Sequence, residues 1–160
     1  MSGLVVAISY WLHLIATSVW IGGIIFVLFI AIPSSKNVLG ADAGKLMGEV
    51  SKRFTTLANY SIALLVISGV VLMGLSKQLS GIWTPNSWTT ILILKHVLVL
   101  GMIIVHFYRG LFLAPKIMKT ISATEKATLQ KLSLNLVKVN FSMGIVVLLP
   151  SGMASALDLK

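Results

Sequence analysis

Long apolar runs alternate with short polar stretches along the whole chain. Four runs each hold at least the roughly 20 residues that a helix needs to cross a bilayer. They cover approximately residues 4–32, 54–75, 88–113 and 134–157. Pro33 and Pro115 follow the first and third runs and are predicted to end those helices, because proline interrupts helical hydrogen bonding. Pro150 predicts a kink in the fourth. The pattern predicts an all-α fold, an integral membrane four-helix bundle in which residues 1–160 form a single transmembrane domain.

The polar stretches at residues 36–53 and 116–131 contain signals for helix starts. Asp42 is suited to cap a short helix that continues into the second apolar run. Ser122 and Glu125 have the Ser-x-x-Glu spacing of a capping box, which predicts that a helix begins there. We therefore expect both stretches to be partly helical and to lead into the run that follows.

Composition agrees with a membrane protein. Of the 160 residues, 57% are hydrophobic and only 11% are charged, with a mean hydropathy of +0.97, whereas soluble domains average about 25% charged residues. No basic segment precedes the first run, and that run is too long for the apolar part of a signal peptide, so we expect a retained helix. The chain has no cysteine, which excludes disulfides, thiolate metal sites and covalent haem attachment.

The net charge of +9 is distributed as a membrane topology signal. Ten of the 13 Lys and Arg residues lie in or beside the first and third connections between the apolar runs. These ten are Lys36, Lys45, Lys52, Arg53, Arg109, Lys116, Lys119, Lys126, Lys131 and Lys138. The positive-inside rule then predicts that both termini face outward across the inner (plasma) membrane. With the charge explained in this way and no nucleic-acid-binding motif in the sequence, we expect no nucleic acid partner.

His13 and His96 are the main candidates for a cofactor or metal site. Ionisable side chains inside a membrane are costly and usually functional. Each histidine lies roughly 12–14 Å below the start of its run, on helices predicted to be parallel. Two imidazoles at one depth would suit the axial positions of a b-type haem. The alternatives are copper ligation, and histidines that only hydrogen-bond to neighbouring helices.

Three further residues are candidates for a cofactor site around this pair. Thr17 lies one helical turn after His13, and either Thr17 or a backbone carbonyl oxygen could fix the tautomer of the imidazole. Trp20 lies on the same helix face and would pack either on a haem macrocycle or in an ordinary helix interface. Lys95 would either meet a haem propionate or extend its amine toward the membrane surface.

His106 lies about 15 Å deeper than His96 and has no histidine partner. Together with Met143 it would suit a second haem with His/Met ligation, so we expect one haem or two. The alternatives are a hydrogen bond to Asn140 or Tyr60, or a quinone site. Thioether ligands also suit copper(I), but the seven methionines are dispersed, and core packing is their ordinary use.

Several segments resemble the copper-resistance protein D (CopD) family. They are residues 10–23 (YWLHLIATSVWIGG), Arg53-Phe54, residues 67–70 (ISGV) and residues 92–95 (LILK). The resemblance covers nearly the whole chain and implies a compact four-helix unit that is either a copper-handling protein or a haem b protein grouped with that family.

These observations lead to one functional hypothesis with two alternatives. The hypothesis is a haem b protein that transfers electrons through bis-histidine ligation, with a redox protein or a quinone as its partner. The alternatives are a copper transport or resistance protein, and a structural subunit of a larger membrane complex or homo-oligomer. No carboxylate lies clearly inside an apolar run and no Ser/His/Asp set is evident, so we expect no catalytic residue.

Overall fold

Helices account for nearly all of the chain that the structure describes. The structure is a computed structural model in which residues 2–75 and 87–157 are described. Within these ranges every residue is helical except those of the short connection 120–122, and no strand occurs. The all-α prediction is therefore confirmed. The chain divides into two units, residues 1–81 and 82–160, and each is described on its own below.

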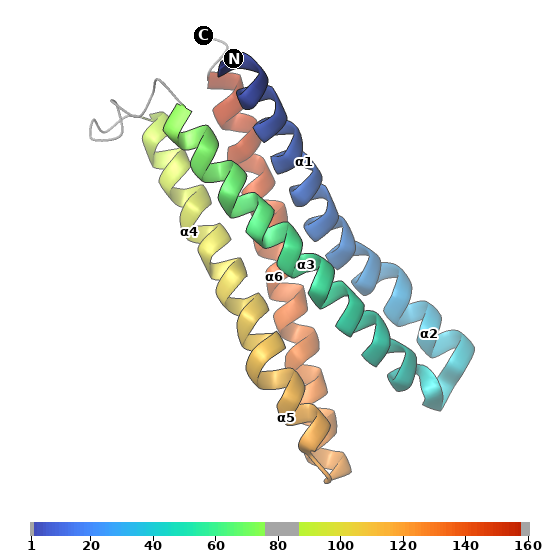
Figure 1. The fold of residues 1–160 in the computed structure, drawn as a ribbon. Helices are drawn as coiled ribbons and strands as arrows, with labels where there is room; N and C mark the ends of the chain where they lie inside the picture. Colours follow the sequence, from blue (N-terminus) through green and yellow to red (C-terminus); the bar gives the residue numbers. More distant parts are fainter. Residues whose placement is uncertain (1, 76–86, 158–160) are drawn as a thin grey trace. The chain divides into compact units, whose positions relative to one another are not determined.

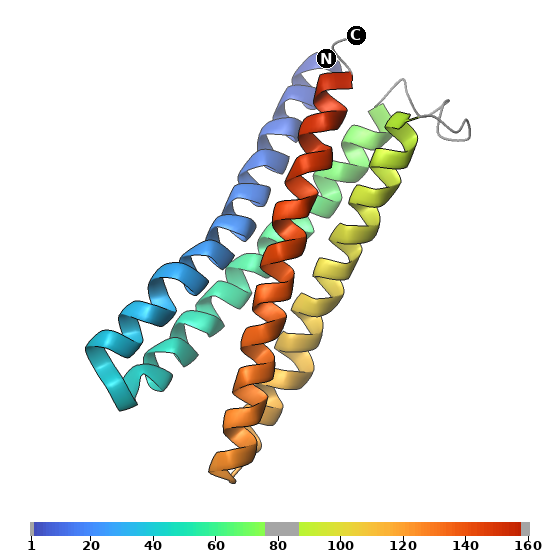
Figure 2. The same cartoon turned by 180° about the vertical axis from the view of Figure 1, so that it is seen from behind.

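The first unit is a helical hairpin. Its elements are α1 (Ser2–Phe26), the π-helical turn η1 (Val27–Ala31), α2 (Ile32–Leu39), the 3₁₀ turn η2 (Gly40–Asp42) and α3 (Ala43–Leu75). α1 and α3 pack against each other along their lengths (Figure 1, Figure 2). The chain reverses at Gly40, whose φ of 51° lies in the left-handed region that glycine adopts without a steric penalty. Asp42 directly precedes α3, and the predicted helix after it continues into the second apolar run as one helix of 33 residues.

The second unit is also a pair of packed helices. Its elements are α4 (Ser87–Phe107), the π-helical turn η4 (Tyr108–Leu113), α5 (Ala114–Lys119) and α6 (Ala123–Leu157). The Oγ atom of Ser122 accepts the backbone N–H of Glu125 at 3.4 Å, so the predicted start of a helix at the capping-box sequence is confirmed. α6 then runs through Pro150 without interruption (Figure 2).

The predicted helix ends at Pro33 and Pro115 are wrong. Each proline lies in the first turn of a helix that continues the preceding one, up to Leu39 in the first unit and up to Lys119 in the second. In both cases a π-helical turn directly precedes the helix that contains the proline. The wider turn changes the hydrogen-bonding register, and the first turn of a helix tolerates a residue that lacks an N–H. The helices therefore extend beyond their apolar runs.

Three stretches of the described chain are long and apolar enough to cross a membrane: Gly3–Gly74, Thr90–Lys119 and Ala123–Gly152. The first contains the turn at Gly40 and so includes both long helices of the hairpin. Many large apolar side chains on these stretches are exposed, as expected for helices that contact lipid. The buried residues of α1 follow a helical stripe that includes Ala16, Trp20 and Ile24.

Candidate functional site

His13 is held by a serine on the neighbouring helix of its own unit. The Nδ1 atom of its imidazole lies 2.9 Å from the Oγ atom of Ser68 on α3. The same hydroxyl lies 2.6 Å from the backbone carbonyl oxygen of Leu64. A carbonyl oxygen only accepts, so the single hydroxyl hydrogen is donated to Leu64, and Ser68 Oγ accepts the Nδ1–H of His13. This network fixes the tautomer in which Nε2 carries the lone pair, which is the form that binds a metal through Nε2.

Thr17 does not contact the imidazole of His13 through its hydroxyl. Its Oγ1 atom donates to the backbone carbonyl oxygen of His13 at 2.8 Å, a bond within α1. The residue that orients the ring is Ser68, which sequence reasoning missed. The available signal was a serine beside Gly69 in the otherwise apolar segment 62–75. A Cβ atom on Gly69 would lie 3.7 Å from Cε1 of His13, so this part of α3 is in contact distance of the ring.

His96 has the same tautomer as His13, but a different hydrogen bond fixes it. Its Nδ1 atom lies 2.7 Å from the backbone carbonyl oxygen of Leu92, one turn earlier on α4. Because that oxygen can only accept, Nδ1 carries the hydrogen and Nε2 carries the lone pair. The side chain is exposed, and that of Lys95 is partly buried. His13 and His96 belong to different units, so their pairing stays a prediction.

His106 is buried on α4, with 4% of its surface exposed. Its ring makes an edge-to-face contact with Phe107 at a centroid distance of 5.4 Å. Asn140 on α6 is also buried, but its Oδ1 atom has no hydrogen-bond partner within the described chain. The predicted hydrogen bond between His106 and Asn140 would therefore have to use the amide nitrogen of Asn140, and it stays a prediction. Tyr60, the other predicted partner, is largely exposed.

Met143 lies against the backbone of α4. Its terminal methyl carbon is 2.6 Å from the position that a Cβ atom would occupy on Gly101, so the missing side chain of this glycine leaves room for the thioether. Met102, the next residue on α4, is almost completely buried. Trp20 of the first unit is buried too, with 2% of its surface exposed, which is the burial expected of an ordinary helix interface and leaves its role at a cofactor a prediction. A thioether and an imidazole thus lie on the two helices of the second unit.

No group of three or more His, Cys, Asp or Glu side chains that could hold a metal ion occurs in the parts of the chain that the structure describes. Imidazole and thioether donors together favour a soft ion such as copper(I) over a hard one.

Comparison with known families supports this chemistry. The family model for copper resistance protein D matches residues 48–156, which is more than half of the chain. The chain belongs to the copper-resistance protein D family. The resemblance seen in the sequence is therefore confirmed, and the protein is a multi-pass membrane protein. No curated protein and no solved structure matches the chain.

The extent of the match matters for the candidate residues. It includes His96, His106 and Met143, whereas His13 lies before the matched segment. The family supports a role in copper resistance, the alternative drawn from the sequence, and gives no support to haem-dependent electron transfer.

Proposed function

We propose that this protein handles copper in the inner (plasma) membrane, where it binds copper(I) as cargo for transport or resistance. The observation that carries the proposal is the match to the copper-resistance protein D family over residues 48–156. The absence of cysteine from the sequence leaves imidazole and thioether side chains as the available soft or intermediate ligands.

In this proposal His13 and His96 are the principal ligands. Both imidazoles donate through Nδ1, to Ser68 and to the carbonyl oxygen of Leu92, so both would bind copper through Nε2. Hydrogen bonds of this kind orient a ligating ring and raise its basicity. Lys95, Thr17 and Trp20 would contribute to the surroundings of the ligands rather than bind the ion.

His106 and Met143 are proposed as a second pair of donors. The structure has Met143 close to α4 at Gly101, and His106 lies five residues further along the same helix. A thioether and an imidazole would provide a weaker site than a thiolate set. Weak sites that exchange ligands readily suit an ion that must be released again.

The proposed topology has one transmembrane domain with four membrane-crossing helices and both termini outside. In each unit the turn that joins the two long helices is where Lys and Arg gather, at residues 36–53 and 116–131. α3 has 33 residues and α6 has 35, so each is roughly 50 Å long at about 1.5 Å per residue, longer than the ~30 Å hydrocarbon core. The excess length would project on the basic, cytoplasmic side.

Copper(I) titration of the purified protein against a competing chelator tests the proposal. We expect stoichiometric binding at the stronger site that is lost in His13→Ala and in His96→Ala, since each removes a proposed ligand. The weaker binding assigned to His106 and Met143 should remain in both variants. Leu14→Ala is a matched control because Leu14 neighbours His13 on α1 and is exposed. Cells that express the wild type should change their copper content, and cells with the histidine variants should not.

Two results would contradict the proposal. One is the absence of copper binding, and the other is stoichiometric binding whose affinity is unchanged by both histidine substitutions. The absorption spectrum of the same samples after dithionite reduction tests the alternative function, haem binding. A sharp α-band that disappears in both histidine variants would favour bis-histidine haem ligation and electron transfer instead of copper handling.

A further inference from the structure

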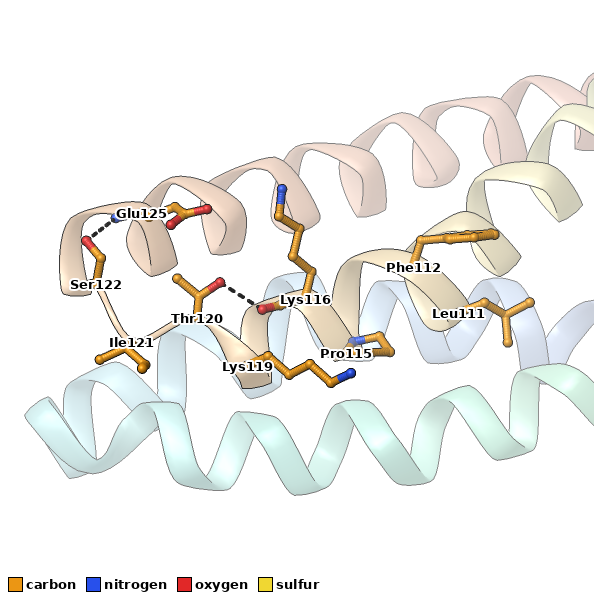
Figure 3. A pocket seen from close by; sticks show the side chains of 9 residues that line it. All are labelled: Leu111, Phe112, Pro115, Lys116, Lys119, Thr120, Ile121, Ser122 and Glu125. Carbon is orange, nitrogen blue, oxygen red and sulfur yellow. Dashed lines mark hydrogen bonds between the residues drawn. The ribbon is translucent and has the colours of Figure 1, made fainter.

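An open hollow lies at the end of the second unit where α5 gives way to α6 (Figure 3). Its volume is about 610 Å³, within the ~300–1,000 Å³ range of small-molecule sites. All residues that line it belong to the turn η4, to α5, to the connection 120–122 or to the first turn of α6. They are Leu111, Phe112, Pro115, Lys116, Lys119, Thr120, Ile121, Ser122 and Glu125.

The lining changes from apolar to polar along the helix axis. Leu111, Phe112 and Pro115 come first, and the lysines and hydroxyl groups follow. Leu111 and Phe112 are 65% and 68% exposed, so their side chains are available to a ligand or to lipid. The order corresponds to that of a phospholipid, whose acyl chains lie toward the membrane interior and whose phosphate lies at its surface.

The hollow also lies where the apolar stretch ends. The stretch Thr90–Lys119 is long and apolar enough to cross a membrane, and its last residue lines the hollow. Ile121 in the following connection is 99% exposed. An isoleucine side chain in that position is more stable at the boundary between headgroups and acyl chains than in water. These two features favour a ligand that is part of the bilayer.

We propose that this hollow binds the phosphate group of an anionic phospholipid. Lys116 and Lys119 both line the hollow from α5, and their amines extend apart, one toward α6 and one away from it (Figure 3). Both amines therefore have to turn toward a bound phosphate, which the flexible four-carbon side chain of lysine allows. The N-terminus of α6 adds the partial positive charge of a helix dipole. Glu125 is the one carboxylate among the lining residues, so the lining keeps a positive net charge. The proposal is independent of copper binding.

The hydroxyl groups in the hollow have structural roles. Thr120 Oγ1 donates to the backbone carbonyl oxygen of Lys116 at 2.8 Å, and Ser122 Oγ accepts the N–H of Glu125 (Figure 3). These bonds end α5 and begin α6, so they shape the hollow, and the lysine amines are left as the groups that recognise phosphate. A lysine near a membrane surface strengthens binding to anionic lipid by about fivefold.

Native mass spectrometry of the full-length protein in detergent micelles with added phosphatidylglycerol or phosphatidylcholine tests this site. We expect the wild type to retain phosphatidylglycerol preferentially. The double substitution Lys116→Gln/Lys119→Gln should weaken that binding by about 25-fold, from about fivefold per lysine. The matched control is Lys126→Gln/Lys131→Gln, which removes the same charge from exposed positions on α6 outside the hollow. It should weaken the binding by less than about threefold, because these two lysines do not line the hollow and screening reduces the effect of charges outside it.

Three results would overturn the proposal. Equal retention of phosphatidylcholine and phosphatidylglycerol would show that the net charge of the lipid does not contribute to binding. Equal losses in the two double variants would mean that overall charge, rather than this hollow, attracts the lipid. Displacement of phosphatidylglycerol by an equal concentration of inorganic phosphate would identify a site for free anions. Unchanged circular dichroism of both variants shows that the lipid measurement compares folded proteins.

Discussion

The packing of α1 on α3 predicts opposite outcomes for the same substitution at two adjacent glycines. A Cβ atom on Gly23 would overlap the ring of Phe54, with Cδ2 at 2.9 Å and Cε2 closer still. A Cβ atom on Gly22 would meet nothing within 4 Å. Replacing glycine by alanine in a helix gains up to ~1 kcal/mol from backbone propensity, and overpacking costs about 1–3 kcal/mol. Gly22→Ala should therefore be neutral or stabilising, and Gly23→Ala should be less stable than Gly22→Ala by about 1–3 kcal/mol.

The assay is reversible unfolding in mixed detergent micelles, followed by circular dichroism. Because the two variants carry the same chemical change at neighbouring positions of one helix, the gain in propensity cancels in their difference. Phe54→Leu in the Gly23→Ala background should restore most of the lost stability, since a smaller side chain leaves room for the added methyl group. Equal stabilities of Gly22→Ala and Gly23→Ala, or no rescue by Phe54→Leu, would refute the close approach of α1 and α3 at this point.

Two further predictions concern the ligand and the topology. Ser68→Ala should lower the copper(I) affinity of the site at His13 by about 10–100-fold, because it removes the acceptor that orients the imidazole. Ser61→Ala is the control for that titration, because Ser61 is buried on the same helix and its hydroxyl donates to a carbonyl oxygen of that helix. Equal effects of the two serine substitutions would contradict the assigned role of Ser68. A reporter fused at Lys126 should be cytoplasmic and one fused after Lys160 external, and the opposite result would reverse the proposed orientation.

The sequence predicted the helical content and one helix start well because these depend on local chemistry. A Ser-x-x-Glu spacing can satisfy backbone N–H groups wherever it occurs, and the helix after Ser122 begins where that rule places it. The helix ends at Pro33 and Pro115 were mispredicted because the rule that proline ends a helix considers only its missing N–H and the steric clash of its pyrrolidine ring. The π-helical turns before the prolines change the hydrogen-bonding register, and no local residue pattern predicted these turns.

The orienting residue of His13 was mispredicted for a similar reason. Thr17 has the correct spacing to lie on the same face of α1, but a threonine in an apolar helix commonly donates to the carbonyl oxygen four residues earlier. That carbonyl oxygen is the one of His13 itself. Ser68 makes a bond of the same kind within α3 and still accepts from the imidazole, because a hydroxyl oxygen has acceptor capacity left after its hydrogen is donated. The hydrogen-bond partner of the His13 ring nitrogen depends on which helices pack together. Helix packing could not be predicted from this one amino-acid sequence.

The two histidines reach the same tautomer in ways that differ in their dependence on packing. The Nδ1–H of His96 is donated to the carbonyl oxygen of Leu92 on its own helix, so this tautomer persists wherever α4 moves. The Nδ1–H of His13 is donated to Ser68 on another helix, so it depends on the contact between α1 and α3. A displacement of α1 along α3 by one helical turn, ~5.4 Å, would break the second bond and leave the first intact. If His13 and His96 bind copper as proposed, the basicity of His13 would respond to helix movement, and that of His96 would not.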